Sequence, residues 1–348
     1  MAGTSASETN QIYISVIVIV YDRDKYINDA LRSLQNQTLN MEKFEVILVT
    51  NIRLTLQEFP GMNLRVIESS SKKGTAKYAE GMNSSKGEII CFLEDDDAFS
   101  PEKLEVVCNV FTSYPDIAFY KNNTLKTHDV NQYMNGSGRH KLDSNFAKIF
   151  KVSSSTSRKL FWKLRRNRMN FNTSSMCISK QFYYKDDVIK LLNCEGIAGD
   201  ELIFLVPFTF RNQVNVVYDS RKITFYRRNV SFSKSVVKKV NLDEYINHSV
   251  IFIKFMIDSY EKFSNIFCNV PVLLEYGRLE AASYSLRLNL FTNGRSSVRQ
   301  FYLALTTAML ETDVYMGVII FLAITQLILP SKVYKICFKI MFQILTKL

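Results

Sequence analysis

Four consecutive carboxylates, Glu94, Asp95, Asp96 and Asp97, form the sequence feature with the clearest chemical potential. Adjacent carboxylates repel one another unless a cation lies among them. Their hard oxygen atoms suit Mg²⁺ or Mn²⁺. A charge run is often a solvated face or a tail, but this run directly follows residues 88–93, an apolar stretch typical of a strand buried on both faces. We therefore expect a divalent cation here, able to bridge two nucleotide phosphates and to neutralise a leaving diphosphate.

A second acidic pair, Asp200 and Glu201, precedes the apolar stretch 202–210. A carboxylate within hydrogen-bond reach of a hydroxyl group can act as its general base. An Asp at the N-cap followed by a Glu in the first turn is also a common way to begin a helix. The pair alone leaves both roles open, and they are not exclusive.

The elements that position these carboxylates follow from the hydrophobic pattern. Strands are expected at 13–21, 44–50, 64–67 and 88–93, and helices between or after them at 27–34, 76–85 and 101–111. This order predicts an α/β fold with a parallel sheet and right-handed crossovers. Such sheets bind ligands outside the carboxyl ends of their strands. The polar turn 22–24 and the acidic run would both lie at that edge.

The rest of the chain is less regular and then becomes helical. Residues 121–175 show little periodicity, and short elements are expected at 176–178, 186–192, 202–210, 214–218 and 223–226. Long helical patterns begin at about residue 240. We predict a flexible tail at 1–10, a nucleotide-binding domain at 11–239 and a helical region at 240–348.

Composition narrows the classes of function. A hydrophobic content of 47% with 22% charged residues excludes a disordered chain. The formal net charge of +11 suits an anionic partner or serves solubility. Six cysteines without a CxxC pair and only three histidines argue against a zinc site and favour a reducing compartment. The polar start of the chain lacks the pattern of a signal peptide, so we expect a cytoplasmic protein.

The C-terminal segment 314–348 suggests contact with a membrane. Residues 314–329 carry no charge over sixteen positions, whereas a full span needs about 20. After Pro330, lysines interrupt an apolar pattern, as in a basic helix that lies in the membrane interface. Packing helices of a soluble domain and a single membrane span are the alternatives. The basic-aromatic stretch 158–168 would contact lipid phosphates or form a solvated helix face, and nothing else resembles a nucleic-acid module.

Residues 15–104 resemble the family 2 glycosyltransferases, which have the GT-A fold. The resemblance lies in the order SVIVIVYDR, SLQNQT, FEVILV, a basic glycine-containing loop, GEII, and an acidic motif followed by proline. It continues less densely to about residue 233. It implies a GT-A domain with a helical, membrane-associating C-terminal region, and inverting transfer of a sugar from a nucleotide sugar.

The resemblance also implies roles for the acidic run. The family has an Asp-x-Asp-Asp tetrad that holds the metal ion and the ribose, and Glu94 stands in its first position. Asp96 then corresponds to the metal ligand, with Asp97 and Glu94 in support. Asp95 would approach the ribose or a metal-bound water. The expected cofactor is Mg²⁺ or Mn²⁺.

Other matched positions concern the nucleotide and the reaction. The turn of Tyr21, Asp22 and Arg23 would pack on base and ribose, and Asn51 stands where the family usually has an Asp that pairs with the base. Asp200 matches the family's general base, with Glu201 as the second candidate. Basic side chains of two further segments would offset the negative charge of the diphosphate. These are Lys73 or Lys77 in one segment and Arg227 or Arg228 in the other.

Three departures from the family pattern accompany these matches. Tyr78 and Ala79 replace an Arg-Asn pair, and Asn229 replaces a His that can reach the metal. A solvated basic loop is the alternative interpretation of the segment that contains Lys73 and Lys77. The change at Asn51 leaves the identity of the base open.

The function we expect is inverting transfer from a UDP- or GDP-sugar. The expected acceptor is a lipid-linked sugar or polyprenyl phosphate at the cytoplasmic face of the membrane, where the enzyme would lie peripherally or shallowly inserted. No nucleic acid is expected as a partner. A nucleotidyltransferase, and a catalytically silent protein that binds nucleotide sugars at the membrane, are the alternatives.

Overall fold

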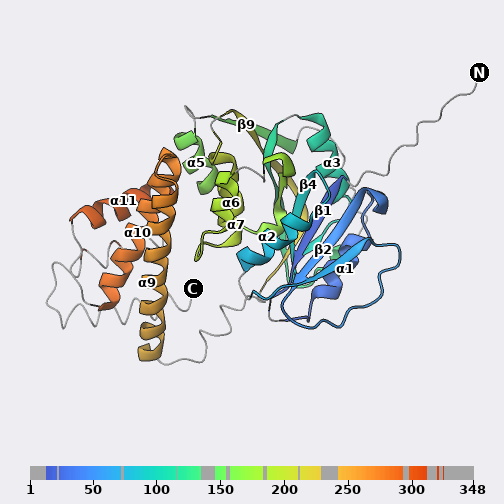
Figure 1. Ribbon diagram of the computed structural model, residues 1–348, viewed down its shortest axis with the longest axis horizontal. Helices are drawn as coiled ribbons and strands as arrows, with labels where there is room; N and C mark the ends of the chain where they lie inside the picture. Colours follow the sequence, from blue (N-terminus) through green and yellow to red (C-terminus); the bar gives the residue numbers. More distant parts are fainter. Residues whose placement is uncertain are drawn as a thin grey trace, which may run out of the picture. The chain divides into compact units, whose positions relative to one another are not determined.

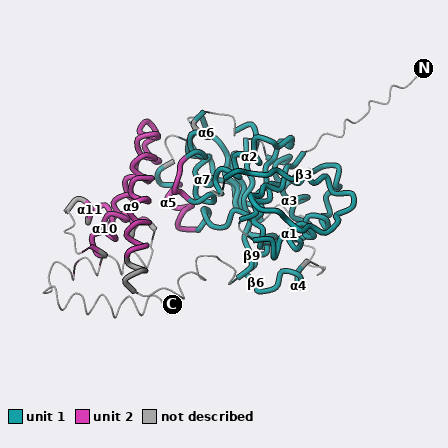
Figure 2. The backbone as a smooth tube through the Cα atoms, turned by 60° about the horizontal axis from the view of Figure 1, so that its bottom comes forward, with its two compact units in different colours: residues 1–160, 168–193, 198–235 teal, residues 161–167, 194–197, 236–348 magenta. Residues whose placement is uncertain are grey.

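The chain forms two compact units (Figures 1 and 2). The structure is a computed structural model that describes residues 13–21, 23–71, 74–114, 116–134, 146–153, 157–182, 186–210, 212–228, 242–292 and 298–311, together with 320 and 324. Unit 1 comprises Met1–Leu160, Arg168–Asn193 and Ala198–Ser235. Unit 2 comprises Val236–Leu348 and two short pieces from earlier in the chain, Phe161–Asn167 and Cys194–Ile197.

The first half of unit 1 has the predicted parallel sheet. Its strands are β1 (Ile14–Ile19), β2 (Phe44–Thr50), β3 (Leu64–Glu68) and β4 (Ile89–Glu94), in the spatial order β3-β2-β1-β4. Ile19 pairs with Val49 on one side and with Glu94 on the other. The carboxyl ends of β1, β2 and β4 therefore lie at one level of the sheet, and the acidic run begins there.

Helices cover both faces of this sheet. They are α1 (Ile27–Gln35), α2 (Gly74–Ser84) and α3 (Lys103–Ser113). Val16 and Val18 of β1 pack in one core cluster with residues of α1 and α3. Ile17 instead faces α2, where a Cβ atom added to Gly81 would meet its Cγ2 atom at 2.5 Å. Because successive side chains of a strand point to opposite faces, burial on both faces explains the unbroken β-branched run.

The second half of unit 1 makes the sheet mixed. Its strands are β5 (Ala98–Phe99), β6 (Ile117–Thr127), β7 (Ala147–Val152), β8 (Met176–Ser179) and β9 (Val214–Arg227). Together with the first four they make a nine-stranded sheet in the order β3-β2-β1-β4-β8-β6-β9-β5, with β7 beside β9. β8 runs antiparallel to both β4 and β6. The structure confirms the α/β class and the parallel order of β1 to β4, and the later strands make the whole sheet mixed.

Two expectations about this region were wrong. β6 is an eleven-residue strand where little regular structure was predicted, and β9 is one strand where two were predicted. Polar residues inside these strands conceal the strand pattern. They are buried because they have partners: the amide of Asn122 on β6 donates to Thr224 Oγ1 on β9 at 2.9 Å.

Short elements complete the unit. The helices are α4 (Asn131–Met134), α5 (Ser157–Arg166, shared with unit 2), α6 (Asp186–Leu192) and α7 (Gly199–Leu205). The 3₁₀ turns are η1 (Met41–Lys43), η3 (Thr173–Ser175), η4 (Lys180–Phe182) and η5 (Val206–Phe208).

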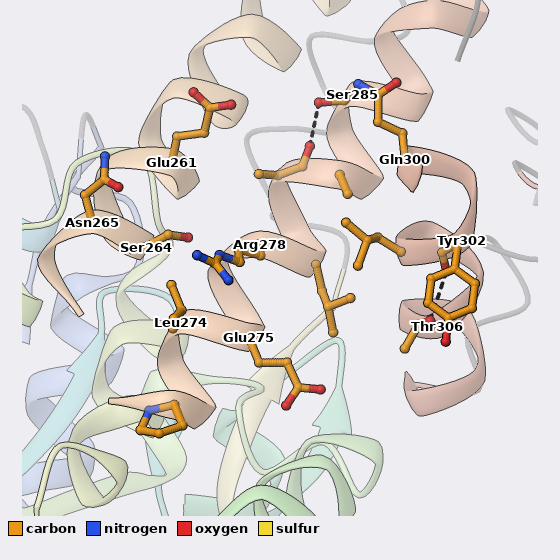
Figure 3. Close-up of a pocket in the computed structure, with 15 residues that line it drawn as sticks. Glu261, Ser264, Asn265, Leu274, Glu275, Arg278, Ser285, Gln300, Tyr302 and Thr306 are labelled. Atoms are coloured by element: carbon orange, nitrogen blue, oxygen red, sulfur yellow. Dashed lines mark hydrogen bonds between the residues drawn. The ribbon is translucent and has the colours of Figure 1, made fainter. Parts of the chain in front are cut away.

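Unit 2 contains the helices α9 (Leu242–Ile266), α10 (Pro271–Thr292) and α11 (Val298–Glu311). α10 packs against both neighbours, and the rings of Tyr260 and Tyr276 lie 5.7 Å apart between α9 and α10. The three helices line an open groove of about 930 Å³, in which Figure 3 shows Glu261, Arg278 and Tyr302. In the described part of the chain, no helix is long and apolar enough to cross a membrane. Apart from residues 320 and 324, segment 314–348 lies outside the described residues.

The aromatic residues of the basic stretch 158–168 are core residues of unit 2. Phe161 and Trp162 are almost fully buried, and the ring of Phe161 lies 5.6 Å from that of Tyr276. Arg165 donates to Glu280 Oε1 at 2.9 Å and lies over the ring of Tyr276. These aromatic side chains are therefore not placed to contact lipid.

Trp162→Ala is expected to destabilise the protein by about 3–5 kcal/mol, the usual cost of emptying a buried aromatic site. Trp162 is 2% exposed and is the chain's single tryptophan, so unfolding is best followed by circular dichroism in urea. The exposed neighbour Lys163 provides the control, because Lys163→Ala should change stability by less than about 0.5 kcal/mol. Equal midpoints for Trp162→Ala and the wild type would contradict this packing.

Candidate active site

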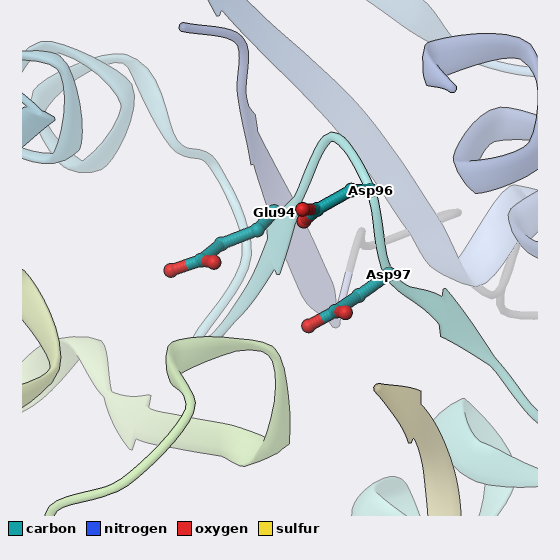
Figure 4. Close-up of side chains that lie close together, drawn as sticks. All are labelled: Glu94, Asp96 and Asp97. Carbon is teal, nitrogen blue, oxygen red and sulfur yellow. The ribbon is translucent and has the colours of Figure 1, made fainter. Parts of the chain in front are cut away.

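The acidic run forms a tight turn between β4 and β5. The backbone N–H of Asp97 donates to the carbonyl oxygen of Glu94 at 3.1 Å and closes the turn. Figure 4 shows the side chains of Glu94, Asp96 and Asp97 leaving it. One carboxylate oxygen from each lies within 4.8 Å of the other two. Three hard oxygen donors at this spacing fit a divalent cation.

Burial makes the charge of these carboxylates costly. It raises the pKa of Asp95 to about 6, although hydrogen bonds from Arg23 oppose the shift. Burial and the charge of Asp96 raise the pKa of Asp97 to about 7. The pKa of Glu94 is also raised, first by burial and then by the carboxylates of Asp97, Asp96, Asp200 and Asp95. The loop therefore favours either a proton or a cation at neutral pH.

Arg23, which follows β1, supplies positive charge to this loop. Its Nε atom donates to Asp95 Oδ2 at 3.2 Å, and its Nη2 atom donates to Asp95 Oδ1 at 3.3 Å. The same Nη2 atom donates to Asp96 Oδ2 at 2.5 Å. The structure thus brings the first turn and the acidic run together at the sheet edge where the sequence places both.

Asn172 joins the acidic loop to the second carboxylate site. Its amide nitrogen donates to Asp97 Oδ2 at 2.7 Å, and its backbone N–H bonds to Asp200 and lowers that residue's pKa. Asn172 has a φ of +67°, a left-handed conformation that Asn tolerates better than most residues. Among the described residues, its buried Oδ1 atom has no hydrogen-bond partner. This oxygen beside Asp97 is a further feature that suits a bound cation.

Two buried lysines fix the turn that follows Asn172. Lys103 Nζ donates to the carbonyl oxygen of Ser174 and, at 2.9 Å, to Thr224 Oγ1. Lys121 Nζ donates to the carbonyl oxygen of Phe171 at 2.6 Å and to Ser175 Oγ at 2.5 Å. Burial lowers the pKa of Lys103 to about 8 and that of Lys121 to about 7. Neither lysine could be predicted from the sequence as a site residue, because isolated lysines in strands and helices usually face solvent.

Asp200 and Glu201 lie in the first turn of α7. The N-cap is Ala198, so the N-cap role considered for Asp200 was wrong. Glu201 is 7% exposed and its Oε2 atom accepts a hydrogen bond from Asn170 at 2.7 Å. Asp200 is the more exposed of the two. Burial, with a smaller contribution from the charge of Glu201, raises the pKa of Asp200 to about 6.

Hydrogen bonds from Asn172 to Asp97 and Asp200, and from Arg227 to Asp97, join the acidic loop to α7 and to the end of β9, and electrostatic interactions also link these segments. The charge of Asp200 contributes to the raised pKa of Glu94. Tyr226 on β9 also has a raised pKa, caused first by burial and then by Asp97, Asp96, Glu94 and Asp200. Residues far apart in the sequence therefore form a single site.

The segment around Tyr21 and Asn51 lies at the ends of β1 and β2. Lys77 of α2 is fully buried, and its Nζ atom donates to Asn51 Oδ1 at 2.5 Å and to the carbonyl oxygen of Val20 at 2.7 Å. The same Nζ atom lies 5.4 Å from the centroid of the Tyr21 ring. Tyr21 is 36% exposed. Lys77 thus holds Asn51 rather than extending into a solvated loop.

Arg227 joins β9 to the acidic loop. Its backbone N–H donates to Asp97 Oδ1 at 3.1 Å, and its Nε atom donates to the carbonyl oxygen of Asp96 at 3.0 Å. Its Nη2 atom donates to Asp29 Oδ2 at 2.8 Å. Arg227 is 7% exposed, whereas Arg228 is exposed. The predicted site residues Asp22 and Lys73, and also Asn229, lie outside the described residues.

A mixed sheet, an acidic turn after the parallel strand β4 and a carboxylate on a later helix are the features expected of a GT-A glycosyltransferase. The sequence model for glycosyl transferase family 2 matches residues 15–192, more than half of the 348-residue chain. The chain belongs to this family.

Comparisons with individual proteins agree with this assignment. The chain is 36% identical over 110 residues to an uncharacterized glycosyltransferase of Haemophilus influenzae, a match that covers 30% of this chain and 37% of that protein. It is 29% identical over 122 residues to EpsH of Bacillus subtilis, covering 30% and 35% of the two chains. It thus spans little more than a third of these relatives. The fold is similar to that of S. aureus TarS 1–349 in complex with UDP-GlcNAc, with a TM-score of 0.51, 15% identity, and coverage of 81% of this chain and 74% of that one.

Proposed function

We propose that this protein transfers a sugar from a nucleoside-diphosphate sugar to an acceptor hydroxyl or phosphate, with inversion at the anomeric carbon. One observation carries the proposal. The carboxylates of Glu94, Asp96 and Asp97 converge within 4.8 Å, and Asp200 is close enough to perturb the pKa of Glu94. A leaving-group site and a base for the acceptor are the two parts that direct displacement requires.

The first part is a site for Mg²⁺ or Mn²⁺ at Asp96, Asp97 and Glu94. The donor set consists of carboxylate oxygens, and beside Asp97 lies the Oδ1 atom of Asn172, which has no hydrogen-bond partner in the described part of the chain. When bound, the ion would neutralise charge on the departing diphosphate. Asn172 and Arg227 hold Asp97 through hydrogen bonds to its two oxygens, so the loop is organised in advance.

The nucleotide would be bound by residues at the ends of β1, β2, β4 and β9. Asn51, held by Lys77, presents an amide to the base, and the exposed ring of Tyr21 can stack on the base. Asp95, with Asp22 and Arg23 of the first turn, would approach the ribose. Lys73 and Arg228 are proposed to bind phosphate oxygens, while the buried Lys77 and Arg227 support them from within the fold.

In the transfer step, Asp200 takes the proton of the acceptor hydroxyl as the acceptor oxygen forms a bond to the anomeric carbon. The bond between that carbon and the phosphate oxygen breaks, and the nucleoside diphosphate leaves. Glu201 remains the second candidate for the base, but its hydrogen bond to Asn170 favours a supporting role. No covalent intermediate is required.

The rate of transfer is expected to fall as the pH drops through about 6. Asp200 acts as a base only when ionised, and its pKa is raised to about 6, so the ionised fraction is nearly complete at pH 7.5 and small at pH 5. Below the pKa, kcat/KM should fall about tenfold per pH unit. Rates measured in a series of buffers with saturating Mn²⁺ test this prediction. A rate that does not change between pH 7.5 and pH 5 would contradict the assignment of the base.

The proposal also specifies the sugar donor, the acceptor and the place of the reaction in the cell. TarS was solved with UDP-GlcNAc, which supports a UDP-sugar, and a GDP-sugar is the other donor we propose. We propose a lipid-linked sugar or polyprenyl phosphate as acceptor at the cytoplasmic face of the membrane, with segment 314–348 as the contact. The proposed organisation is a tail at 1–10, a GT-A domain at 11–239 and a helical region at 240–348.

The product released separates this proposal from its alternatives. Purified protein incubated with Mn²⁺, UDP- or GDP-sugars and membrane lipid extract should release nucleoside diphosphate. Release of pyrophosphate from a nucleoside triphosphate would instead indicate a nucleotidyltransferase. Tight binding of a nucleotide sugar without turnover in any lipid fraction would indicate a catalytically silent binding protein.

A further inference from the structure

We propose that Arg23 is an exchangeable internal cation: it neutralises Asp95 and Asp96 when no metal ion is bound, and it releases Asp96 when a divalent cation binds. This inference rests on the metal site in the proposed function, and it concerns how strongly that site binds metal before any nucleotide arrives.

Arg23 donates hydrogen bonds to the carboxylates of both Asp95 and Asp96. Two nitrogen atoms, Nε and Nη2, bind the two oxygens of Asp95, which is 1% exposed. Nη2 also donates to Asp96 Oδ2 at 2.5 Å, the shortest of these three contacts, and the side chain of Asp96 is 12% exposed. A metal ion bound by the Asp96 carboxylate would take the place of Nη2 there, while the separate contact of Nε with Asp95 Oδ2 can be kept.

Charge makes the guanidinium and the metal ion competitors. Asp96 belongs to the three carboxylates that converge for a cation, and Arg23 already donates to it. A cation favours the ionised form of a carboxylate and repels a second cation at the same group. The metal ion therefore has to displace Arg23 from Asp96 or bind beside it against repulsion.

The other arginine of the site shows why this exchange belongs to Arg23. Arg227 is 7% exposed, contacts Asp96 only at its carbonyl oxygen, and is also held by Asp29 and by the ring of Tyr26. Its contacts leave the carboxylate of Asp96 accessible. The Arg23 side chain is 27% exposed, lies in the loop after β1, and donates directly to the Asp96 carboxylate.

The test is Mn²⁺ binding to the full chain without nucleotide, measured by calorimetry and by the electron paramagnetic resonance signal of free Mn²⁺. Arg23→Gln should bind Mn²⁺ about tenfold more tightly than the wild type, because one adjacent charge changes the binding equilibrium of a carboxylate by about this factor. Its melting temperature in chelator should be lower than that of the wild type, and Mn²⁺ should restore it. Arg166→Gln removes the same charge from an exposed position on α5 and should bind like the wild type.

The outcomes separate this inference from the proposed function. Asp96→Asn should lose binding, which locates the ion. If wild-type binding depends on Asp96 but Arg23→Gln binds equally or more weakly, the exchange is refuted and the metal site stands. If wild-type protein does not bind Mn²⁺, both fail. Should Arg23→Gln not fold, Arg23→Lys decides the question: its single nitrogen cannot occupy the positions of both Nε and Nη2, so its hold on Asp96 should weaken and it should also bind Mn²⁺ more tightly.

Discussion

Asp200→Asn is expected to lower the rate of sugar transfer by about 10²- to 10⁴-fold, the range that a positioned general base contributes. The amide keeps the shape of the side chain and an oxygen that can accept the hydrogen bond from the backbone N–H of Glu201. It cannot take a proton from the acceptor. Initial rates of nucleoside diphosphate release would measure the loss, while circular dichroism and donor binding should match the wild type.

Glu201→Gln provides the matched control for this result. Its side chain is buried and bound to Asn170, so the substitution should cost far less activity than the change at Asp200. A larger loss in Glu201→Gln than in Asp200→Asn would exchange the roles of the two residues. Full activity in both variants would remove α7 from the mechanism.

Asp96→Ala is expected to abolish metal-dependent donor binding and to reduce kcat/KM by at least about 100-fold. Loss of a residue that only supports a metal ligand already lowers metal affinity or activity by about 10- to 100-fold. Asp96 supplies one of three converging carboxylates, and its backbone carbonyl, which Arg227 binds, remains after the substitution. Arg23 keeps both of its contacts with Asp95. The fold should therefore persist, which circular dichroism would verify.

Asp24→Asn is the control for Asp96→Ala, because it removes a negative charge from the exposed position next to Arg23. It should leave Mn²⁺ affinity and donor binding unchanged. If Asp24→Asn weakened both as much as Asp96→Ala, general electrostatic attraction rather than ligation would account for the loss.

The parts of the fold that could be predicted are those with a local signal. The β-branched run of β1 and the apolar runs of β2 and β4 indicate strands buried on both faces, and the structure has them there. Parallel strands place their carboxyl ends at one edge. This is why the contact of Arg23 with the acidic loop could be expected, although its partners Asp95 and Asp96 lie 72 and 73 positions further along the chain.

The parts that could not be predicted depend on tertiary partners. Asn122 of β6 is fully buried through Thr224, a residue about a hundred positions away, and nothing local indicates this. Lys103 and Lys121 resemble surface residues in sequence but bind the turn that carries Asn172. The role of Asn172 depends on its left-handed backbone and on Asp97, 75 positions away.

The most direct test of the central claim is donor binding with and without metal. Wild type, Asp200→Asn and Asp96→Ala would be titrated with UDP- and GDP-sugars in Mn²⁺ or in chelator, following the melting temperature. We expect one nucleotide sugar to raise the melting temperature of wild type and Asp200→Asn only with Mn²⁺, and we expect Asp96→Ala not to respond. No response of folded wild-type protein to any nucleotide sugar, with Mn²⁺ present, would contradict the central claim.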